Sequence, residues 1–235
     1  MKNEGLNPRL SCAAGFVRQG AVFADIGTDH AYLPLFLLEE GIIERAVCSD
    51  INEGPLESAR RNAAERGLSD RCAFLLADGA CEALALGATD VAICGMGGEL
   101  IADIVKRAKK MCTPNIRLIL QPMTRQAYLR AFLLSEGFRI VSEGYSREGG
   151  RCYLCIVAEY TGECREISEV TAEVGECADI VNKSAHIDYL KLKKRVLEKE
   201  INGRALGGTV TEFDKKILPA LEEKICELEK ESEKK

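Results

Sequence analysis

The stretch ADIGTDHAYLP, residues 24–34, decides the fold of this chain of 235 residues. An apolar run ends in an acid, passes one glycine, and reaches a second acid and a histidine before a new apolar pattern begins. The run predicts a buried strand over 21–25, and the pattern that follows predicts a helix over 31–40. A turn that only connects a strand to a helix has no need of Asp29 and His30. We therefore regard this turn as a candidate functional site.

Apolar runs alternate with helical patterns as far as residue 160, which is typical of an α/β fold with a mostly parallel sheet and helices on both faces. The last two runs should form an antiparallel pair around a turn at Gly149 and Gly150, so that an antiparallel strand closes the sheet. We expect the strands after the first to end at the following residues: Asp50, Asp78, Gly95 and the pair Gln121–Pro122.

Beyond Tyr160 the strand patterns stop, and an acidic stretch precedes two helical patterns over 184–205 and 211–231. Apolar residues recur every three to four positions in both patterns, so we expect an antiparallel amphipathic hairpin. The predicted organisation is one domain over 1–160, followed by an acidic linker and a coiled-coil-like hairpin over 161–235. The hairpin must rest its apolar stripe on itself, on the sheet or on a second chain, so the sequence allows a monomer or a homodimer.

The composition favours a cytoplasmic protein. No apolar run approaches the roughly 18 residues that a membrane span needs, and residues 1–20 lack the apolar block of a signal peptide. The 11 cysteines are scattered singly through apolar patterns, as is usual in a reducing compartment. One CxxC motif occurs, at Cys152 and Cys155, but no second cysteine pair or histidine pair accompanies it. We therefore expect no metal site.

Charge is unevenly distributed along the chain, although the net charge is −5. Residues 101–160 carry ten Lys or Arg against five Asp or Glu, whereas residues 161–180 carry six acids and one Arg. A local basic face neutralises the phosphates of a nucleic acid, so the negative total does not exclude such a partner. Charge alone favours the alternative, an ordinary solvated surface.

Three acids stand at the ends of three successive predicted strands: Asp25, Asp50 and Asp78. Ligands of an open parallel sheet bind beyond the carboxyl ends of its strands. The first turn lacks the GxGxxG motif of a dinucleotide site, and its carboxylates would repel a pyrophosphate. A cationic nucleoside suits them better. In S-adenosylmethionine, Asp50 can accept both ribose hydroxyls and Asp78 can accept the adenine amine.

The cofactor prediction extends to the loop residues beside these acids. Gly27 lets the backbone approach the methionine part of the cofactor. Each acid is also a good helix cap, and for one acid alone the two interpretations are equal. Three acids in register favour the cofactor. The predicted cofactor-binding residues are Asp25, Gly27, His30, Asp50, Ile51, Asp78, Gly79 and Gly95.

Four motifs, in this order and spacing, resemble the bacterial tRNA adenine-N1 methyltransferases that modify the adenosine at position 22 of tRNA: DIGTDHAYLP, DINEGPLESA, CGMGGELI and LILQP. The resemblance covers about residues 10–160 and extends more loosely to the helical tail. It implies a class I S-adenosylmethionine-dependent methyltransferase with a Rossmann-like sheet, followed by a C-terminal coiled-coil hairpin. One departure is Met123. The family usually has Asn at this place, so an amide that would contact the target base is missing here.

The implied reaction is methyl transfer to N1 of adenine, whose lone pair is free at neutral pH. The enzyme must then align the reacting atoms, and a carboxylate near the base can hold the exocyclic amine and stabilise the developing positive charge. Asp29 is the candidate for this catalytic role. His30 either donates to the methionine carboxylate or locks the turn, and the sequence favours neither.

The resemblance also implies a surface for tRNA. The target base must leave its stack and lie against an aromatic or apolar surface, and basic side chains must hold the remaining phosphates. The glycine-rich loop after the fourth strand brings the base close to backbone groups, unless it merely begins a helix. The predicted tRNA-binding residues are Tyr32, Met96, Gly97, Gly98, Gln121, Pro122, Arg9, Arg125 and Arg130, together with Arg18 and the basic first tail helix.

Two alternatives stay open on the sequence alone. One is a class I methyltransferase that acts on a small molecule or a protein, against which the basic segment and the hairpin argue. The other is a dimerising module that binds a nucleoside without catalysis. The presence of all three acids at the strand ends argues against the second alternative.

Overall fold

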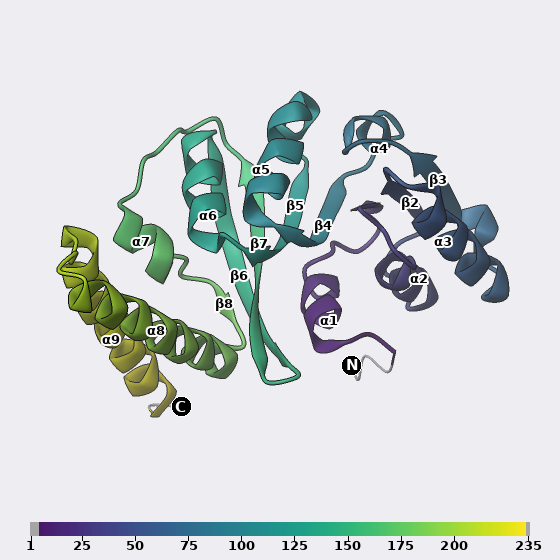
Figure 1. Cartoon of the computed structure of the whole chain (residues 1–235). Helices are drawn as coiled ribbons and strands as arrows, with labels where there is room; N and C mark the ends of the chain where they lie inside the picture. The colour runs from purple at the N-terminus through teal and green to yellow at the C-terminus, as the bar shows by residue number, and fades with distance from the viewer. Residues whose placement is uncertain (1–4, 234–235) are drawn as a thin grey trace.

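The computed structural model describes residues 5–233, and its core is an eight-stranded sheet in the order β3-β2-β1-β4-β5-β7-β6-β8 (Figure 1). Only β7 runs antiparallel to its neighbours, β5 and β6. The strands are β1 (Val22–Ile26), β2 (Arg45–Asp50), β3 (Cys72–Leu76), β4 (Asp90–Gly97), β5 (Arg117–Thr124), β6 (Phe138–Glu148), β7 (Arg151–Tyr160) and β8 (Ile180–Val181).

Nine α-helices occur within the described residues. They are α1 (Pro8–Ala14), α2 (Tyr32–Glu39), α3 (Glu53–Glu65), α4 (Cys81–Ala85), α5 (Gly98–Arg107), α6 (Gln126–Ser135), α7 (Glu169–Val174), α8 (Lys183–Leu206) and α9 (Glu212–Glu233). The strand order and the reversed β7 confirm the predicted mostly parallel α/β sheet with an antiparallel closing strand.

The two faces of the sheet are covered by different helices, because side chains alternate along each strand. On β1, Phe23 packs with apolar residues of α1, α2 and α3, whereas Ala24 and Ile26 pack with residues of α4, α5 and α6. On β4, Ala92 lies on the first of these faces and its neighbours lie on the second. The strands are therefore buried on both sides, which explains their continuous apolar runs.

The chain beyond Tyr160 differs from the prediction in one respect. The strand patterns were expected to stop there, but β8 pairs in parallel with β6 through Ile180 and Val181. A strand of two residues leaves no period in a sequence, which is why the pattern could not predict it. The acidic segment also contains α7, which Ser168 caps by accepting a hydrogen bond from the Thr171 amide. The division into residues 1–160 and 161–235 stays a prediction.

The predicted helical hairpin is confirmed as α8 and α9, joined by a turn at Gly207 and Gly208. Its apolar stripe rests on itself and on the sheet: Leu190 and Ile217 are fully buried in the same core cluster as residues of β6 and β7. In Figure 1 the hairpin lies at the β6–β8 end of the sheet, and α2 and α3 lie at the opposite end.

Candidate functional site

The carboxyl ends of the strands carry glycines in the left-handed region. Gly27 follows β1 with φ +77°, Gly79 follows β3 with φ +108°, and Gly95 lies in β4 with φ +81°. Only glycine adopts these angles without strain. A Cβ on Gly27 would also lie 2.0 Å from the Met96 Cε, so the thioether side chain of β4 covers this turn. A side chain at Gly27 would thus need Met96 to move, and the contact between Gly27 and the cofactor stays a prediction.

A cleft of about 230 Å³ opens beside the first turn. It lies between α1, the β1–α2 turn and β4. The structure brings together in this cleft three residues predicted for the cofactor, Asp25, Gly27 and His30, and three predicted for catalysis or tRNA. The residues that line it are Asn7, Arg9, Leu10, Asp25, Gly27, Asp29, His30, Ala31, Tyr32, Leu33 and Cys94.

Asp25 is buried at the end of β1, and its carboxyl group has a pKa raised to about 6. Burial is the main cause, because removal from water disfavours the carboxylate. The negative charge of Asp50 raises the pKa further, whereas Thr28 and the Arg9 guanidinium lower it. A nearby cation would therefore bind strongly to this carboxylate once it ionises.

Asp29 and His30 are within reach of each other, with His30 Nε2 3.3 Å from Asp29 Oδ2. The His30 ring also stacks on Tyr32, with ring centroids 5.1 Å apart. Asp29 is exposed, and Tyr32 is 46% exposed. Both are thus available to a large substrate, which agrees with their predicted roles without testing them.

The backbone of this turn is strained and held in place. Ala31 has φ +55°, which costs a non-glycine residue about 1 kcal/mol. The Asn62 side chain of α3 donates to the His30 carbonyl oxygen at 2.9 Å and fixes the turn. Asn62 is not predictable from a local motif, because its contact joins residues 32 positions apart.

The predicted ribose and adenine residues lie along the ends of β2 and β3. Asp50 is half-buried and accepts a hydrogen bond from the Asn52 amide at 2.8 Å, while Ile51 is 64% exposed. Asp78 is exposed and forms a bidentate ion pair with Arg107 at 2.6 and 3.1 Å, which holds the pKa of its carboxyl below the usual value. A cofactor amine at Asp78 would therefore compete with Arg107, a residue that the sequence analysis did not consider.

Gln121 is fully buried in β5, where its side-chain oxygen accepts two hydrogen bonds. One comes from Arg9 Nη1 of α1 at 2.7 Å, and the other comes from the Gly95 amide at 3.0 Å. Gln121 was predicted to contact tRNA, and this prediction is wrong in this structure, because no part of its side chain reaches the surface. Its neighbour Pro122 is buried as well. The sequence signal for α1 was present in Asn7 and Pro8, a helix cap followed by proline at the first position.

Gly98 allows two loops of the site to touch. A Cβ at this position would lie 2.5 Å from the Arg125 carbonyl oxygen and 2.9 Å from that of Thr124. The buried Gly98 therefore has a packing role, whereas Gly97 and Met96 are partly exposed. Arg125 is exposed and pairs with Glu99 at 2.7 Å, so its guanidinium lies at the mouth of this loop.

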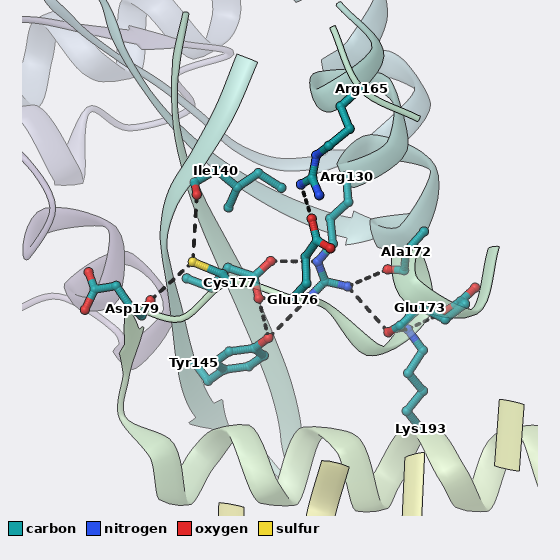
Figure 2. Close-up of polar contacts among 11 residues, drawn as sticks. Arg130, Ile140, Tyr145, Arg165, Ala172, Glu173, Glu176, Cys177, Asp179 and Lys193 are labelled. Atoms are coloured by element: carbon teal, nitrogen blue, oxygen red, sulfur yellow. Dashed lines mark hydrogen bonds and ion pairs between the residues drawn. The ribbon is translucent and has the colours of Figure 1, made fainter. Parts of the chain in front are cut away.

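Arg130 was predicted to contact tRNA, and this prediction is wrong, because only 2% of its surface is exposed. Its guanidinium donates to the Glu143 carboxylate at 2.6 and 3.1 Å. It also donates to the Tyr145 hydroxyl and to the Ala172 carbonyl oxygen (Figure 2). Arg130 lies on the buried face of α6 together with Leu129, Leu133 and Leu134.

Two other basic groups that were predicted to bind tRNA are paired with acids, and their contact with tRNA stays a prediction. Arg18 bonds Asp90 at 2.7 and 2.5 Å, where β4 begins, and so lies at the edge opposite the cleft. The basic first tail helix, α8, is largely neutralised by acids of α7 and α9. Its ion pairs are Lys183–Glu231, Lys191–Glu229, Lys193–Glu173 and Lys194–Glu222.

No helix within residues 5–233 is long and apolar enough to cross a membrane. No cluster of three or more His, Cys, Asp or Glu in the same range is arranged to hold a metal ion.

Comparison with known proteins places this site in a family. A model of the methyltransferase domain matches residues 6–156. The tRNA (adenine(22)-N(1))-methyltransferase of Bacillus subtilis is 38% identical over 155 residues, which are 66% of this chain and 65% of that protein. The aligned segment thus spans just under two thirds of the length of that relative.

Solved structures match over nearly the whole chain. Streptococcus pneumoniae Sp1610, a candidate tRNA (m1A22) methyltransferase solved with S-adenosyl-L-methionine, is 31% identical with a TM-score of 0.76, covering 94% of this chain and 99% of that chain. M. capricolum TrmK, solved with S-adenosyl-homocysteine, is 26% identical with a TM-score of 0.69, covering 96% of this chain and 97% of that chain. The second match includes the helical hairpin, which the family model does not reach.

Proposed function

We propose that this chain, which belongs to the family of the bacterial tRNA (adenine-N1)-methyltransferases, transfers a methyl group from S-adenosylmethionine to N1 of the adenosine at position 22 of tRNA. The observation that carries the proposal is the cleft at the end of β1, where Asp25, Asp29 and Tyr32 meet. Such a substrate places the enzyme in the cytoplasm, and the buried apolar stripe of the hairpin favours a monomer.

The residues at the strand ends fit the cofactor. Asp50 and the exposed Ile51 lie where a ribose and an adenine ring would be held, and the left-handed glycines let a ligand approach the backbone. When bound, the cofactor supplies an electrophilic methyl group on a sulfonium. Asp25 offers a buried carboxylate to the cationic end of this ligand. Asp78 must give up its ion pair with Arg107 before it can accept a hydrogen bond from the adenine amine.

Asp29 is proposed to hold the target base. Its exposed carboxylate can accept the exocyclic amine of adenine and thereby fix N1 in line with the methyl group. As N1 becomes alkylated, the ring gains a positive charge, which the same carboxylate stabilises. His30 at 3.3 Å restrains the Asp29 carboxylate, and the half-exposed Tyr32 beside it offers a ring on which an unstacked base can lie.

The tRNA-binding surface is proposed to include the basic residues Lys106, Lys109 and Lys110 in addition to Arg125. The three lysines are exposed, and none of them has an acidic partner within 4.0 Å in the part of the chain that the structure describes. Four lysines of α8, by contrast, already have carboxylate partners. Free ammonium groups release more counterions on binding a phosphate than paired ones do.

The function is tested by incubating the protein with labelled S-adenosylmethionine and unmodified bacterial tRNA, followed by nucleoside analysis. We expect 1-methyladenosine at position 22, and transcripts with guanosine at that position should remain unmodified. Label found in protein or small molecules, with none in tRNA, would favour the alternative methyltransferase function. Binding of cofactor without any transfer would favour the module that lacks catalysis.

The catalytic assignment predicts that Asp29→Asn lowers kcat by 100-fold or more while cofactor affinity changes less than threefold. The reason is that Asp29 is exposed toward the substrate, whereas Asp25 is buried beneath the cleft. Single-turnover methylation measures the first quantity and calorimetry measures the second. Glu99→Gln, which alters a carboxylate paired with Arg125 on the next loop, is the matched control. Turnover of Asp29→Asn within a few-fold of the unchanged protein would remove Asp29 from this role.

A further inference from the structure

Two cysteines without a part in the proposed methyl transfer meet where α1 packs on the sheet: Cys12 of α1 and Cys155 of β7. Cys155 is 1% exposed, and the partly exposed Cys12 packs against the same apolar cluster. Cys155 also belongs to the CxxC motif, but the other cysteine of this motif, Cys152, packs against the cluster on the opposite face of the sheet. The thiol of α1 is therefore the one that lies beside Cys155.

A glycine makes room for this contact. Gly144 of β6 is paired directly with Cys155, and a Cβ at Gly144 would lie 2.6 Å from the Cys12 Sγ. Directly opposed residues of an antiparallel pair have their Cβ positions about 5 Å apart on one face of the sheet. The Cys12 sulfur thus lies over the β6–β7 pair, within reach of the Cys155 side chain.

The two thiols differ in reactivity. A hydrogen bond from Cys155 lowers the pKa of the Cys12 thiol in spite of burial, and the same contact, together with burial, raises the pKa of Cys155. The thiolate is the form that attacks a disulfide. Cys12 is therefore the attacking thiol, and the buried Cys155 is placed to resolve the product. This arrangement is typical of redox-sensing cysteine pairs.

A second thiol contact, between Cys48 of β2 and Cys72 of β3, lacks the geometry of a disulfide. Cys72 is paired with Ala46, so Cys48 lies two residues further along its strand. With strands about 4.8 Å apart and a rise of about 3.3 Å per residue, the two Cα atoms are about 8 Å apart, beyond the roughly 7 Å that a disulfide spans. Cys12, by contrast, lies on a helix of 7 residues that no strand pairing holds.

We propose that Cys12 and Cys155 form a reversible disulfide, with a low-molecular-weight disulfide such as oxidised glutathione as the oxidant. The Cys12 thiolate attacks one sulfur of the oxidant, which gives a mixed disulfide and releases one thiolate. The Cys155 thiolate then attacks the Cys12 sulfur and releases the second. The two cysteines are oxidised, the oxidant is reduced to two thiols, and these take up the two protons that the cysteines lose. The bond ties α1, a wall of the cleft, to the sheet.

The test equilibrates the reduced full-length protein with glutathione buffers of increasing oxidised fraction. Free thiols are then trapped by alkylation in denaturant, and the peptides are mapped by mass spectrometry. We expect a peptide that joins Cys12 to Cys155 and that dithiothreitol separates again, whereas Cys48 and Cys72 should be recovered alkylated. Hydrogen exchange of the α1 amides should slow about tenfold or more on oxidation, because the bond opposes local opening of this short helix.

Cys155→Ala should stop at a mixed disulfide of glutathione with Cys12, without slower exchange in α1. Cys152→Ala is the matched control, because it removes the other cysteine of the CxxC motif and should leave the bond intact. A thermal melt of each variant checks folding. An unchanged protein that joins Cys48 to Cys72, or that carries only mixed disulfides at its exposed cysteines, would overturn the proposal.

Discussion

Ionisation of the buried Asp25 carboxyl group should lower the stability of the fold but raise the affinity for a cationic ligand. Its pKa is raised to about 6, chiefly by burial and then by Asp50, while Thr28 and Arg9 act in the other direction. The thiols of Cys48 and Cys94 also face it and have raised pKa values themselves. In the folded protein without ligand, Asp25 therefore favours the protonated form more than it does in the unfolded chain.

This shift predicts that Asp25→Asn raises the melting temperature at pH 7. The pKa of Asp25 is higher in the folded protein than in the unfolded chain, so its protonated form stabilises the fold. This contribution is complete below about pH 3.8 and is lost as the pH rises through 6. The amide removes that loss because it never ionises. The check is a series of thermal melts between pH 4 and pH 8, in which the difference between the two proteins should grow with pH and level off above 6.

Cofactor affinity should respond in the opposite direction. Binding of a cationic ligand favours the ionised Asp25, so the affinity for S-adenosylmethionine should fall up to about tenfold per pH unit below 6. Asp25→Asn should bind more weakly at pH 7 and lose this dependence, as measured by calorimetry from pH 5 to pH 8. An affinity that stays flat in the unchanged protein would show that the carboxylate does not face the ligand.

The acids at the strand ends could be predicted from the sequence, whereas the burial of two polar residues could not. The acids at strand ends were predictable, because the carboxyl edge of a parallel sheet is a known place and each apolar run ends at a readable position. Gln121 and Arg130 were wrongly predicted to contact tRNA. A polar residue within an apolar pattern gives the same sequence signal whether its partner is a buried protein group or a ligand. The partner of Arg130, Glu143, is 13 residues away on another element.

At the scale of elements, the two loops that follow β4 and β5 are packed backbone to backbone at Gly98. Gly98→Ala should therefore destabilise the protein by about 2 kcal/mol or more, since the carbonyl oxygens of Thr124 and Arg125 cannot move aside as a flexible side chain would. Urea unfolding measures the change.

The matched control is Gly54→Ala in α3. Nothing lies within 4 Å of a Cβ at that position, and its backbone is helical, so alanine should stabilise the protein by about 0.5–1 kcal/mol. Two substitutions of the same kind should thus have opposite signs. A loss below about 0.5 kcal/mol for Gly98→Ala would mean that the loops separate without cost.

Elements with a strong period were predicted well, and those without one were not. The hairpin helices lie within two residues of their expected bounds at each end, because each carries several apolar turns. The N-terminal helix α1 and the strand β8 were missed. Both are too short to show a period in the sequence. The strand β8 is formed through its pairing with the edge strand β6.

At the scale of the whole molecule, the distribution of paired and unpaired lysines predicts which surface meets tRNA. Lys106→Gln with Lys110→Gln should weaken tRNA binding about tenfold and lower the slope of log affinity against log salt by about two, one for each lost phosphate contact. Lys191→Gln with Lys194→Gln should change the slope much less, since both ammonium groups already have carboxylate partners. Filter binding over a series of salt concentrations measures both. Equal slopes for the two double variants would place the binding surface elsewhere.

The hydrogen bonds of the buried Arg130 guanidinium have a consequence for protein engineering. Two of its four partners, Glu143 and Tyr145, belong to β6, while the carbonyl oxygens of Ala172 and Glu173 come from the segment before the hairpin. Lys193 of α8 in turn donates to the Glu173 carbonyl oxygen (Figure 2), and His186 of α8 stacks on Tyr145 at 4.1 Å. The tail is thus no exchangeable module. A chimera that grafts the hairpin of a relative onto this sheet must transplant the arginine, its carboxylate and the stacked tyrosine as one set, or leave a charge buried without its complement.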